Sequence, residues 1–203
     1  VDIADASAVE RAIREYRPWA IVNACGYVRV DEAEREPERC RRENTLGPVV
    51  LAVACARHGL RLLTFSSDLV FDGERRTAYV ESDPVAPLSV YGHTKAEAER
   101  RVLVLDPAAL VVRTSAFFGP WDSVNFVSLA LDALSQRRPF VAASDLIVSP
   151  TYVPDLVHAS LNLLVDGEQG LWHLANRDAL SWAQLARKAA RMAGIPTATL
   201  QER

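Results

Sequence analysis

The chain has 203 residues, a net charge of −3 and a hydrophobic content of 49%, the values of a soluble globular protein with an ample core. The slightly acidic balance and the lack of a basic stripe argue against a protein that binds nucleic acid. No apolar run reaches the roughly 18 residues that a membrane span needs, and no signal peptide opens the chain. We therefore expect a cytoplasmic protein with no membrane partner.

The first half of the chain alternates helical and strand patterns. Residues 6–16 carry apolar side chains at helical spacing, and Ser7 is the expected cap of that helix. Residues 19–24 (WAIVNA) form a short continuous apolar run, which is typical of a strand buried on both faces. A polar segment follows, and then a helix through LGPVVLAVACARHG that we expect to end at Gly59. Residues 60–67 (LRLLTFSS) predict a second buried strand.

The second half begins with a third buried strand and then becomes less regular. That strand lies within residues 106–115 (DPAALVVRTS), and residues 126–136 and 153–167 predict two amphipathic helices. A short strand (GLWHLAN) and a last helix ending at Gly194 follow, after which the chain stops without an obvious terminal element. Strands that alternate with helices predict an α/β fold built on a parallel sheet.

The cysteine and glutamate residues of the chain do not have the spacing of metal ligands or of a C-x-x-C pair. Cys25, Cys40 and Cys55 form no C-x-x-C pair and have no histidine at ligand spacing, so we interpret them as small apolar residues of a reducing compartment. Glu32, Glu34 and Glu36 alternate among arginines, which favours a solvated face over a metal site. We predict no metal.

One tyrosine and one lysine have the spacing of a catalytic pair. Tyr91 and Lys95 lie one helical turn apart, and only Lys95 and Lys188 among the 23 basic residues are lysines. A lysine at this distance places a positive charge beside the phenol, whose ordinary pKa near 10 is too high for efficient proton transfer at neutral pH. Ser67, at the end of the second strand, is placed to bond a substrate carbonyl in the crevice beyond the strand ends. The competing interpretation is a solvated helical pair without function.

The segments NACGYVRVDEAE, ENTLGP, SSDLVFDG, SVYGHTKAEAE, VVRTSAFFGP and NFV follow one another in this order. Together they resemble the extended short-chain dehydrogenase/reductases, and within them the dTDP-4-dehydrorhamnose reductase family. The resemblance covers residues 1–195 and implies a Rossmann-like doubly wound parallel sheet with a smaller C-terminal substrate-binding lobe. It implies reduction, with NADPH or NADH, of a 4-keto group on a nucleotide-linked deoxysugar, in the biosynthesis of dTDP-rhamnose, and a homodimer.

The resemblance also assigns residues to the site. Tyr91 is implied as the general acid, Lys95 as the residue that lowers its pKa and holds the nicotinamide ribose, and Ser67 as the residue that orients the ketone. Asn44 resembles an asparagine that helps to place the lysine. The other residues implied to bind the cofactor are Asp2 and Ile3, beside the adenine, and Asn23, Ala24 and Cys25 along its path. The residues implied to bind the substrate are Ser67, Asp68, Leu69, Ala116 and Asn125.

The sequence departs from the family pattern in three places. It has no glycine-rich phosphate-binding motif after a strand, so we expect it to lack the first βαβ unit of the family fold. The family shows an aromatic residue at the positions of Leu69 and Ala116, and its DQxGxPT motif reads DLIVSPT here. We accordingly expect a partial NAD(P)-binding Rossmann domain over residues 1–115. Residues 116–203 are expected to form mostly a substrate-binding lobe, with segments at about 141–175 returning to the sheet.

Two alternative functions remain open from the sequence. An epimerase or dehydratase of the same superfamily would share Tyr91 and Lys95, but a dehydratase usually has more than the one acidic residue that follows Ser67 here, Asp68. A non-catalytic regulatory subunit on the same fold would explain the missing aromatic residues, although the intact Ser67, Tyr91 and Lys95 oppose it. The resemblance favours the reductase.

Overall fold

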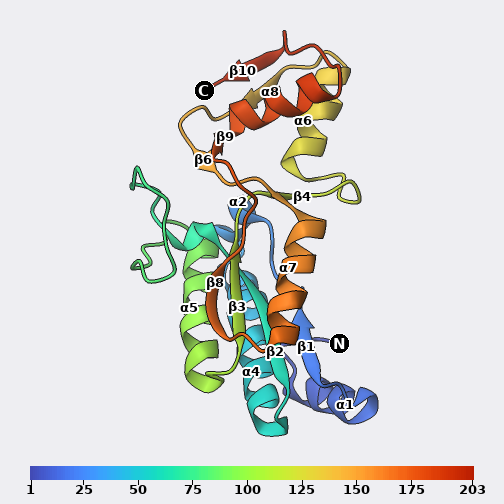
Figure 1. Cartoon of the computed structure of the whole chain (residues 1–203), viewed down its shortest axis with the longest axis vertical. Coiled ribbons are helices and arrows are strands. Elements are labelled where there is room, and N and C mark those ends of the chain that lie inside the picture. Colours follow the sequence, from blue (N-terminus) through green and yellow to red (C-terminus); the bar gives the residue numbers. More distant parts are fainter. The chain divides into compact units, whose positions relative to one another are not determined.

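The computed structural model describes residues 1–203, and the chain divides into two compact units (Figure 1). The first unit comprises Val1–Arg113 and Ser160–His173, and the second comprises Thr114–Ala159 and Leu174–Arg203. The helix α7 (Val153–Asp166) runs from the second unit into the first. No helix combines the length and the apolar character that crossing a membrane requires.

The first unit is built on a parallel sheet of four strands in the order β1-β2-β3-β8. β1 pairs with β2, with Ala20 opposite Arg61, and β3 pairs with β8, with Leu110 opposite Gly170; both pairs are parallel. The prediction of a parallel α/β fold is therefore confirmed, and the short strand predicted at GLWHLAN joins the sheet as β8, beside the three longer predicted strands. The strands are β1 (Ala20–Asn23), β2 (Arg61–Ser67), β3 (Leu110–Thr114) and β8 (Gly170–His173).

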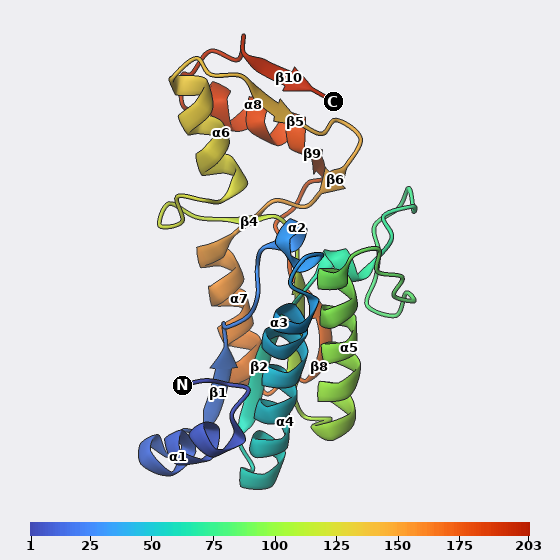
Figure 2. The same cartoon turned by 180° about the vertical axis from the view of Figure 1, so that it is seen from behind.

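Helices cover both faces of this sheet. Figures 1 and 2 show α4 (Gly47–His58) and α5 (Val90–Leu105) together on one face, and the part of α7 that belongs to the first unit on the other. The core between helices and strands is aliphatic, which is the main source of stability for such a layer. Its fully buried members include Val9, Ala52, Cys55, Leu62, Val102 and Val111.

The predicted helix over residues 6–16 is confirmed as α1 (Ala6–Tyr16), but its predicted cap is wrong. Asp5 has an extended backbone, and its carboxylate accepts hydrogen bonds from the backbone N–H groups of Ser7 at 2.9 Å and Ala8 at 3.3 Å. A carboxylate one residue before the helix reaches these free N–H groups, whereas Ser7 already lies inside the first turn. At the end of α4, Gly59 adopts a φ of 66°, the left-handed conformation expected of a glycine that ends a helix.

The polar segment between β1 and α4 is helical. It forms α2 (Val30–Ala33), α3 (Pro37–Arg41) and a single π-helical turn, η1 (Arg42–Leu46), that leads directly into α4. Its acidic residues form surface ion pairs: Glu32 with Arg29 at 2.9 Å, and Glu36 and Glu43 with Arg39 at 3.2 and 2.9 Å. The three cysteines are free; Cys40 and Cys55 are buried as predicted, whereas Cys25 is exposed.

The second unit packs two helices against short strands. α6 (Phe126–Ser135) and α8 (Trp182–Met192) meet through Phe126, whose ring centroid lies 4.5 Å from that of Trp182. The prediction that the chain has no terminal element is wrong, because β10 (Leu200–Glu202) pairs in parallel with β5 (Phe140–Ala142). The remaining strands are β4 (Phe117–Phe118), paired with β7 (Thr151–Tyr152), and β6 (Ile147–Val148), paired with β9 (Leu180–Ser181).

Candidate active site

The helix α5 places Tyr91 and Lys95 on one face, beside the end of β2. The Ser89 hydroxyl caps this helix by accepting a hydrogen bond from the Gly92 N–H group at 3.0 Å, so Tyr91 lies in the first turn and Lys95 one turn later. The Lys95 Nζ atom lies 5.7 Å from the centroid of the Tyr91 ring. The ammonium and the phenol are therefore close enough to influence each other through their charges.

Tyr91 keeps its proton at neutral pH. Burial, followed by the electrostatic influence of Asp68 and Cys40, raises its pKa to about 12, and a hydrogen bond with the Ser67 hydroxyl opposes this shift. The expected role of Lys95 in lowering the pKa of this phenol stays a prediction, because burial is the largest cause of the Tyr91 shift in the structure. A phenol that stays protonated is in the form required of a proton donor.

Lys95 is a buried ammonium group with one hydrogen bond in the structure. Its Nζ atom donates to the Phe65 carbonyl oxygen at 3.2 Å. Burial lowers its pKa to about 8, opposed in part by the neighbouring Cys40 and the Glu99 carboxylate. The lysine is thus largely charged at neutral pH, and two of its three N–H donors are available for a ligand.

The cost of burying Lys95 leads to a prediction about stability. We expect Lys95→Met to raise the free energy of unfolding at neutral pH by roughly 1–3 kcal/mol, because the buried charge is removed and the aliphatic stem is kept. The folded pKa is about 8 and the unfolded value about 10.5, so the unfolded chain binds more protons between these pH values. The penalty is therefore fully present below pH 8 and disappears as the pH rises toward 10.5.

Denaturant unfolding at neutral pH and near pH 10 would measure this effect. Lys188→Met is the matched control, because the Lys188 side chain is 57% exposed and its charge stays hydrated in the fold. A variant at position 95 that is less stable than the parent at neutral pH would contradict the prediction.

Ser67 lies at the end of β2, where the strand turns into the short 3-10 helix η2 (Asp68–Val70). Its hydroxyl caps that turn by accepting a hydrogen bond from the Leu69 N–H group at 3.2 Å, and it donates to the Asp68 Oδ1 atom at 3.0 Å. The same hydroxyl is bonded to Tyr91. Leu69, two residues after Ser67, is 39% exposed, so the turn presents an aliphatic side chain to solvent.

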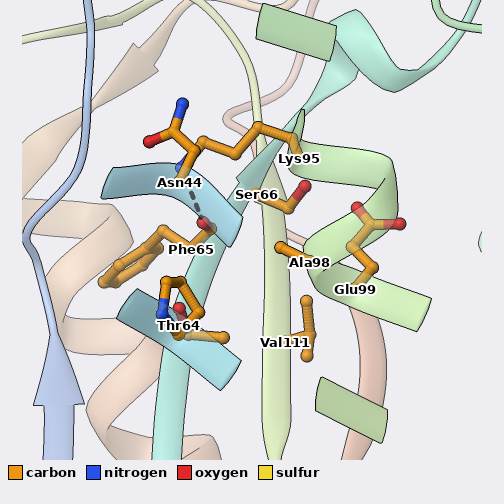
Figure 3. A pocket seen from close by; sticks show the side chains of 9 residues that line it. Asn44, Thr64, Phe65, Ser66, Lys95, Ala98, Glu99 and Val111 are labelled. Atoms are coloured by element: carbon orange, nitrogen blue, oxygen red, sulfur yellow. Dashed lines mark hydrogen bonds between the residues drawn. The ribbon is translucent and has the colours of Figure 1, made fainter. Parts of the chain in front are cut away.

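Asn44 fixes the loop that follows β1. It is fully buried in η1, its Oδ1 atom accepts a hydrogen bond from the Tyr27 N–H group at 2.8 Å, and its Nδ2 atom donates to the Tyr27 carbonyl oxygen at 3.1 Å. Figure 3 shows Asn44 beside Lys95 at a small cavity that is also lined by Ser66 and Glu99. No hydrogen bond joins Asn44 to Lys95, so any influence on the lysine passes through the residues between them.

Three of the residues predicted to bind a cofactor line one cleft in the first unit. Asp2, Ile3 and Cys25 surround a volume of about 220 Å³, together with Gly26 and Arg42, which forms an ion pair with Asp2. Such a volume between a loop at a strand end and a neighbouring segment is a suitable place for part of a dinucleotide.

Asn23 and Ala24, which are also predicted to bind the cofactor, belong to the loop at this cleft. The Asn23 amide donates to the Thr64 hydroxyl at 3.0 Å, and its oxygen accepts from the Cys25 N–H group at 3.1 Å. Asn23 is therefore buried and fully engaged, whereas Ala24 is exposed beside it. In the loop that Asn23 holds, Ala24 is exposed, and Cys25 and Gly26 line the cleft. These residues together with Lys95 fit a nicotinamide dinucleotide.

The predicted substrate residues Ala116 and Asn125 belong to the second unit. Ala116 is half-buried and has a φ of 39°, an unusual conformation for a residue with a side chain. Asn125 caps α6: its Oδ1 atom accepts from the Ser128 N–H group at 3.0 Å, and its amide donates to the Gly119 carbonyl at 3.1 Å. The role of both residues in binding substrate stays a prediction.

Sequence reasoning missed two groups around the pair. Thr94 and Cys40 pack beside Asn44, and Glu99 and Arg113 form a buried ion pair one turn beyond Lys95. Arg113 gave a usable signal, because it is the one charged residue within the apolar strand LVVRT. A charge in a strand buried on both faces needs a buried partner.

Comparison with known proteins places this geometry in context. The family model described as the RmlD substrate binding domain matches residues 1–202. A dTDP-4-dehydrorhamnose reductase from Aggregatibacter actinomycetemcomitans is 35% identical over 192 residues, covering 92% of this chain and 65% of the relative. One from Mycolicibacterium smegmatis is 37% identical over 188 residues, covering 92% and 57%. The chain thus spans less than two thirds of the length of these two relatives.

A solved structure shows the same fold. The dTDP-4-dehydrorhamnose reductase from Bacillus anthracis, determined in complex with NADP, superposes with a TM-score of 0.94 at 32% identity. The match covers all of this chain and 72% of that protein.

Proposed function

The chain belongs to the family of the RmlD substrate binding domain, and on this premise we propose that it forms the catalytic part of a reductase that uses NADPH or NADH to reduce the 4-keto group of a dTDP-linked deoxysugar. We propose dTDP-4-dehydrorhamnose as the substrate and dTDP-rhamnose biosynthesis as the pathway. The observation that carries this proposal is the group formed by Ser67, Tyr91 and Lys95, with a protonated phenol bonded to a serine hydroxyl and facing a buried ammonium.

Each member of this group has a distinct role in the proposed reaction. The Ser67 hydroxyl bonds the ketone oxygen and holds it against Tyr91, and the Tyr91 phenol donates its proton to the alkoxide that forms. A bound nicotinamide cofactor supplies the hydride for the carbonyl carbon. The Lys95 ammonium stabilises the phenolate that remains, and its free donors hold the ribose of the cofactor.

The residues at the cleft support binding of the cofactor. We propose that Asp2 and Ile3 contact the adenine end, and that the loop of Asn23, Ala24 and Cys25 follows the cofactor toward Lys95. Asn44 fixes the end of this loop through its two hydrogen bonds with the backbone of Tyr27. The relative from Bacillus anthracis was solved with NADP, which is consistent with this assignment.

We propose that Asp68, Leu69, Ala116 and Asn125 face the sugar. The names of the relatives show that reductases of this family act on more than one deoxysugar, because a relative from Streptomyces niveus, 32% identical, is named dTDP-4-keto-6-deoxy-D-glucose reductase. Leu69 is aliphatic where the family has an aromatic residue, so the sugar would meet a flexible wall at this position. A homodimer and a cytoplasmic location remain predictions.

An assay of ketone reduction tests the proposal. The natural polypeptide that carries this chain would be mixed with a dTDP-4-keto-6-deoxysugar made in situ and with NADPH or NADH. The proposal expects loss of the near-ultraviolet absorbance of the reduced nicotinamide, and formation of the 4-hydroxy sugar. Measurable cofactor binding without turnover of any such sugar would contradict it, and would favour the regulatory subunit.

A further inference from the structure

Thr94 lies on α5 between the two residues of the proposed catalytic pair, and it is bonded on both its side chain and its backbone. Its hydroxyl donates to the Tyr91 carbonyl oxygen at 2.7 Å and accepts a hydrogen bond from the Asn44 Nδ2 atom at 3.4 Å. Its own carbonyl oxygen accepts a hydrogen bond from the Thr45 hydroxyl at 2.8 Å. The residue is buried, and the Cys40 sulfur lies 3.4 Å from its hydroxyl.

The two partners of Thr94, Asn44 and Thr45, are consecutive residues that bond its side chain and its backbone carbonyl, respectively. Neighbouring side chains on an α-helix point in different directions and seldom converge on one residue. Asn44 and Thr45 lie in the π-helical turn η1, and both reach Thr94 from there. Single π-helical turns within α-helices occur frequently at functional sites, and here the turn brings two donors to one residue of α5.

Asn44 extends this connection to the cleft. Asn44 also forms hydrogen bonds with the N–H and C=O groups of Tyr27, which follows Gly26 in the loop that lines the cleft. That loop also approaches the lysine, since a Cβ atom built on Gly26 would lie 3.6 Å from the Lys95 Nζ atom. The chain of contacts from Gly26 and Tyr27 through Asn44 to Thr94 therefore begins and ends beside Lys95.

We propose that Thr94 is a positioning residue whose hydroxyl, held by Asn44, fixes the turn of α5 that carries Tyr91 and Lys95 against the loop of the cleft. The effect of Thr94 on catalysis rests on the proposed function, but its effect on the placement of Lys95 can be tested separately. A threonine hydroxyl that bonds the carbonyl three residues earlier is common in helices and needs no further role. The second bond, from Asn44, is the one that distinguishes positioning from ordinary helix packing.

The chain offers a direct probe, because Lys95 and Lys188 are its only two lysines. Incorporating lysine labelled with carbon-13 at the ε position gives two signals, which Lys188→Arg assigns. The experiment compares Thr94→Val, which removes the hydroxyl at nearly constant volume, with Thr94→Ser, which keeps it. Thr151→Val is the matched control, since Thr151 is equally buried, lies in the second unit and donates its hydroxyl to the Ser149 carbonyl at 3.0 Å.

We expect Thr94→Val to move both the Lys95 signal and the midpoint of its titration, and Thr94→Ser to restore them. Thr151→Val should leave both unchanged while losing a similar amount of stability. In the natural polypeptide, kcat for ketone reduction should fall roughly 10- to 100-fold in Thr94→Val with KM little changed, and should recover in Thr94→Ser. Thr94→Ala serves the same comparison if the valine variant does not fold.

An unchanged Lys95 signal in a folded Thr94→Val or Thr94→Ala variant would overturn the proposal, whatever the loss of stability. Because this signal needs no cofactor or substrate, it separates a failure of this inference from a failure of the proposed function. A shifted Lys95 signal in a polypeptide that reduces no sugar would support the positioning role and contradict the reductase.

Discussion

Tyr91→Phe is expected to lower the rate of ketone reduction by roughly 10²- to 10⁴-fold, because it removes the proposed proton donor and leaves the ring in place. The phenol has a pKa of about 12 in the structure, so it holds its proton throughout the neutral range. The proton is lost only at strongly alkaline pH. The rate of cofactor oxidation with a saturating 4-keto sugar measures the effect on kcat, and a titration of cofactor fluorescence measures binding independently.

Tyr16→Phe is the matched control for this experiment. Tyr16 lies at the end of α1 in the same unit and is 72% exposed, so the loss of its hydroxyl should change neither rate nor stability. Retention of more than about a tenth of the activity in Tyr91→Phe would exclude Tyr91 as the main proton donor, given the usual effect of removing a general acid. An equal loss in both variants would point to a general disturbance of the fold.

Much of the fold could be predicted from the sequence because its patterns are unambiguous. The continuous apolar runs at residues 19–24 and 60–67 correspond to β1 and β2, and Gly59 ends α4 in the conformation that glycine favours. The pairing of β3 with β8 joins residues some 60 positions apart. No local pattern contains that information, since the order of strands in a sheet is decided by packing across the whole unit.

The residues of the site were more predictable than their electrostatics. The spacing of Tyr91 and Lys95 and the position of Ser67 follow from a helix beside a strand end, and the structure brings them together. The raised pKa of Tyr91 could not be predicted, because the sequence shows which charges are near but not how deeply the phenol is buried. The π-helical turn that places Asn44 and Thr45 has no sequence signal comparable to a cap or a glycine.

The buried ion pair behind Lys95 should have the largest effect on stability. Arg113 and Glu99 form two parallel hydrogen bonds of 2.8 and 2.7 Å, and both side chains are nearly inaccessible to solvent. Arg113 also lies 3.2 Å from the His173 Nε2 atom and 4.8 Å from the centroid of the Phe71 ring. The guanidinium therefore joins α5, β3, β8 and the segment after β2.

We expect Glu99→Gln to lower the free energy of unfolding by about 3–5 kcal/mol, because it leaves the Arg113 cation buried without its counter-charge. The double variant Glu99→Leu with Arg113→Met should recover most of this loss, since replacing a buried pair by apolar side chains of similar volume removes both desolvation penalties. Denaturant unfolding with an unchanged slope measures the difference. Glu43→Gln, which breaks an exposed pair with Arg39, is the control and should cost less than about 1 kcal/mol.

The comparison of the single and double variants decides what the ion pair does. If Glu99→Gln costs no more than Glu43→Gln, the Arg113 charge must reach solvent, and the burial argument fails. If the double variant folds stably, the pair is not required for stability, and its remaining role is the charge that Glu99 places near Lys95. In that case the Lys95 titration midpoint should move to lower pH in Glu99→Gln, because the carboxylate that favours the ammonium is gone while the Arg113 cation stays.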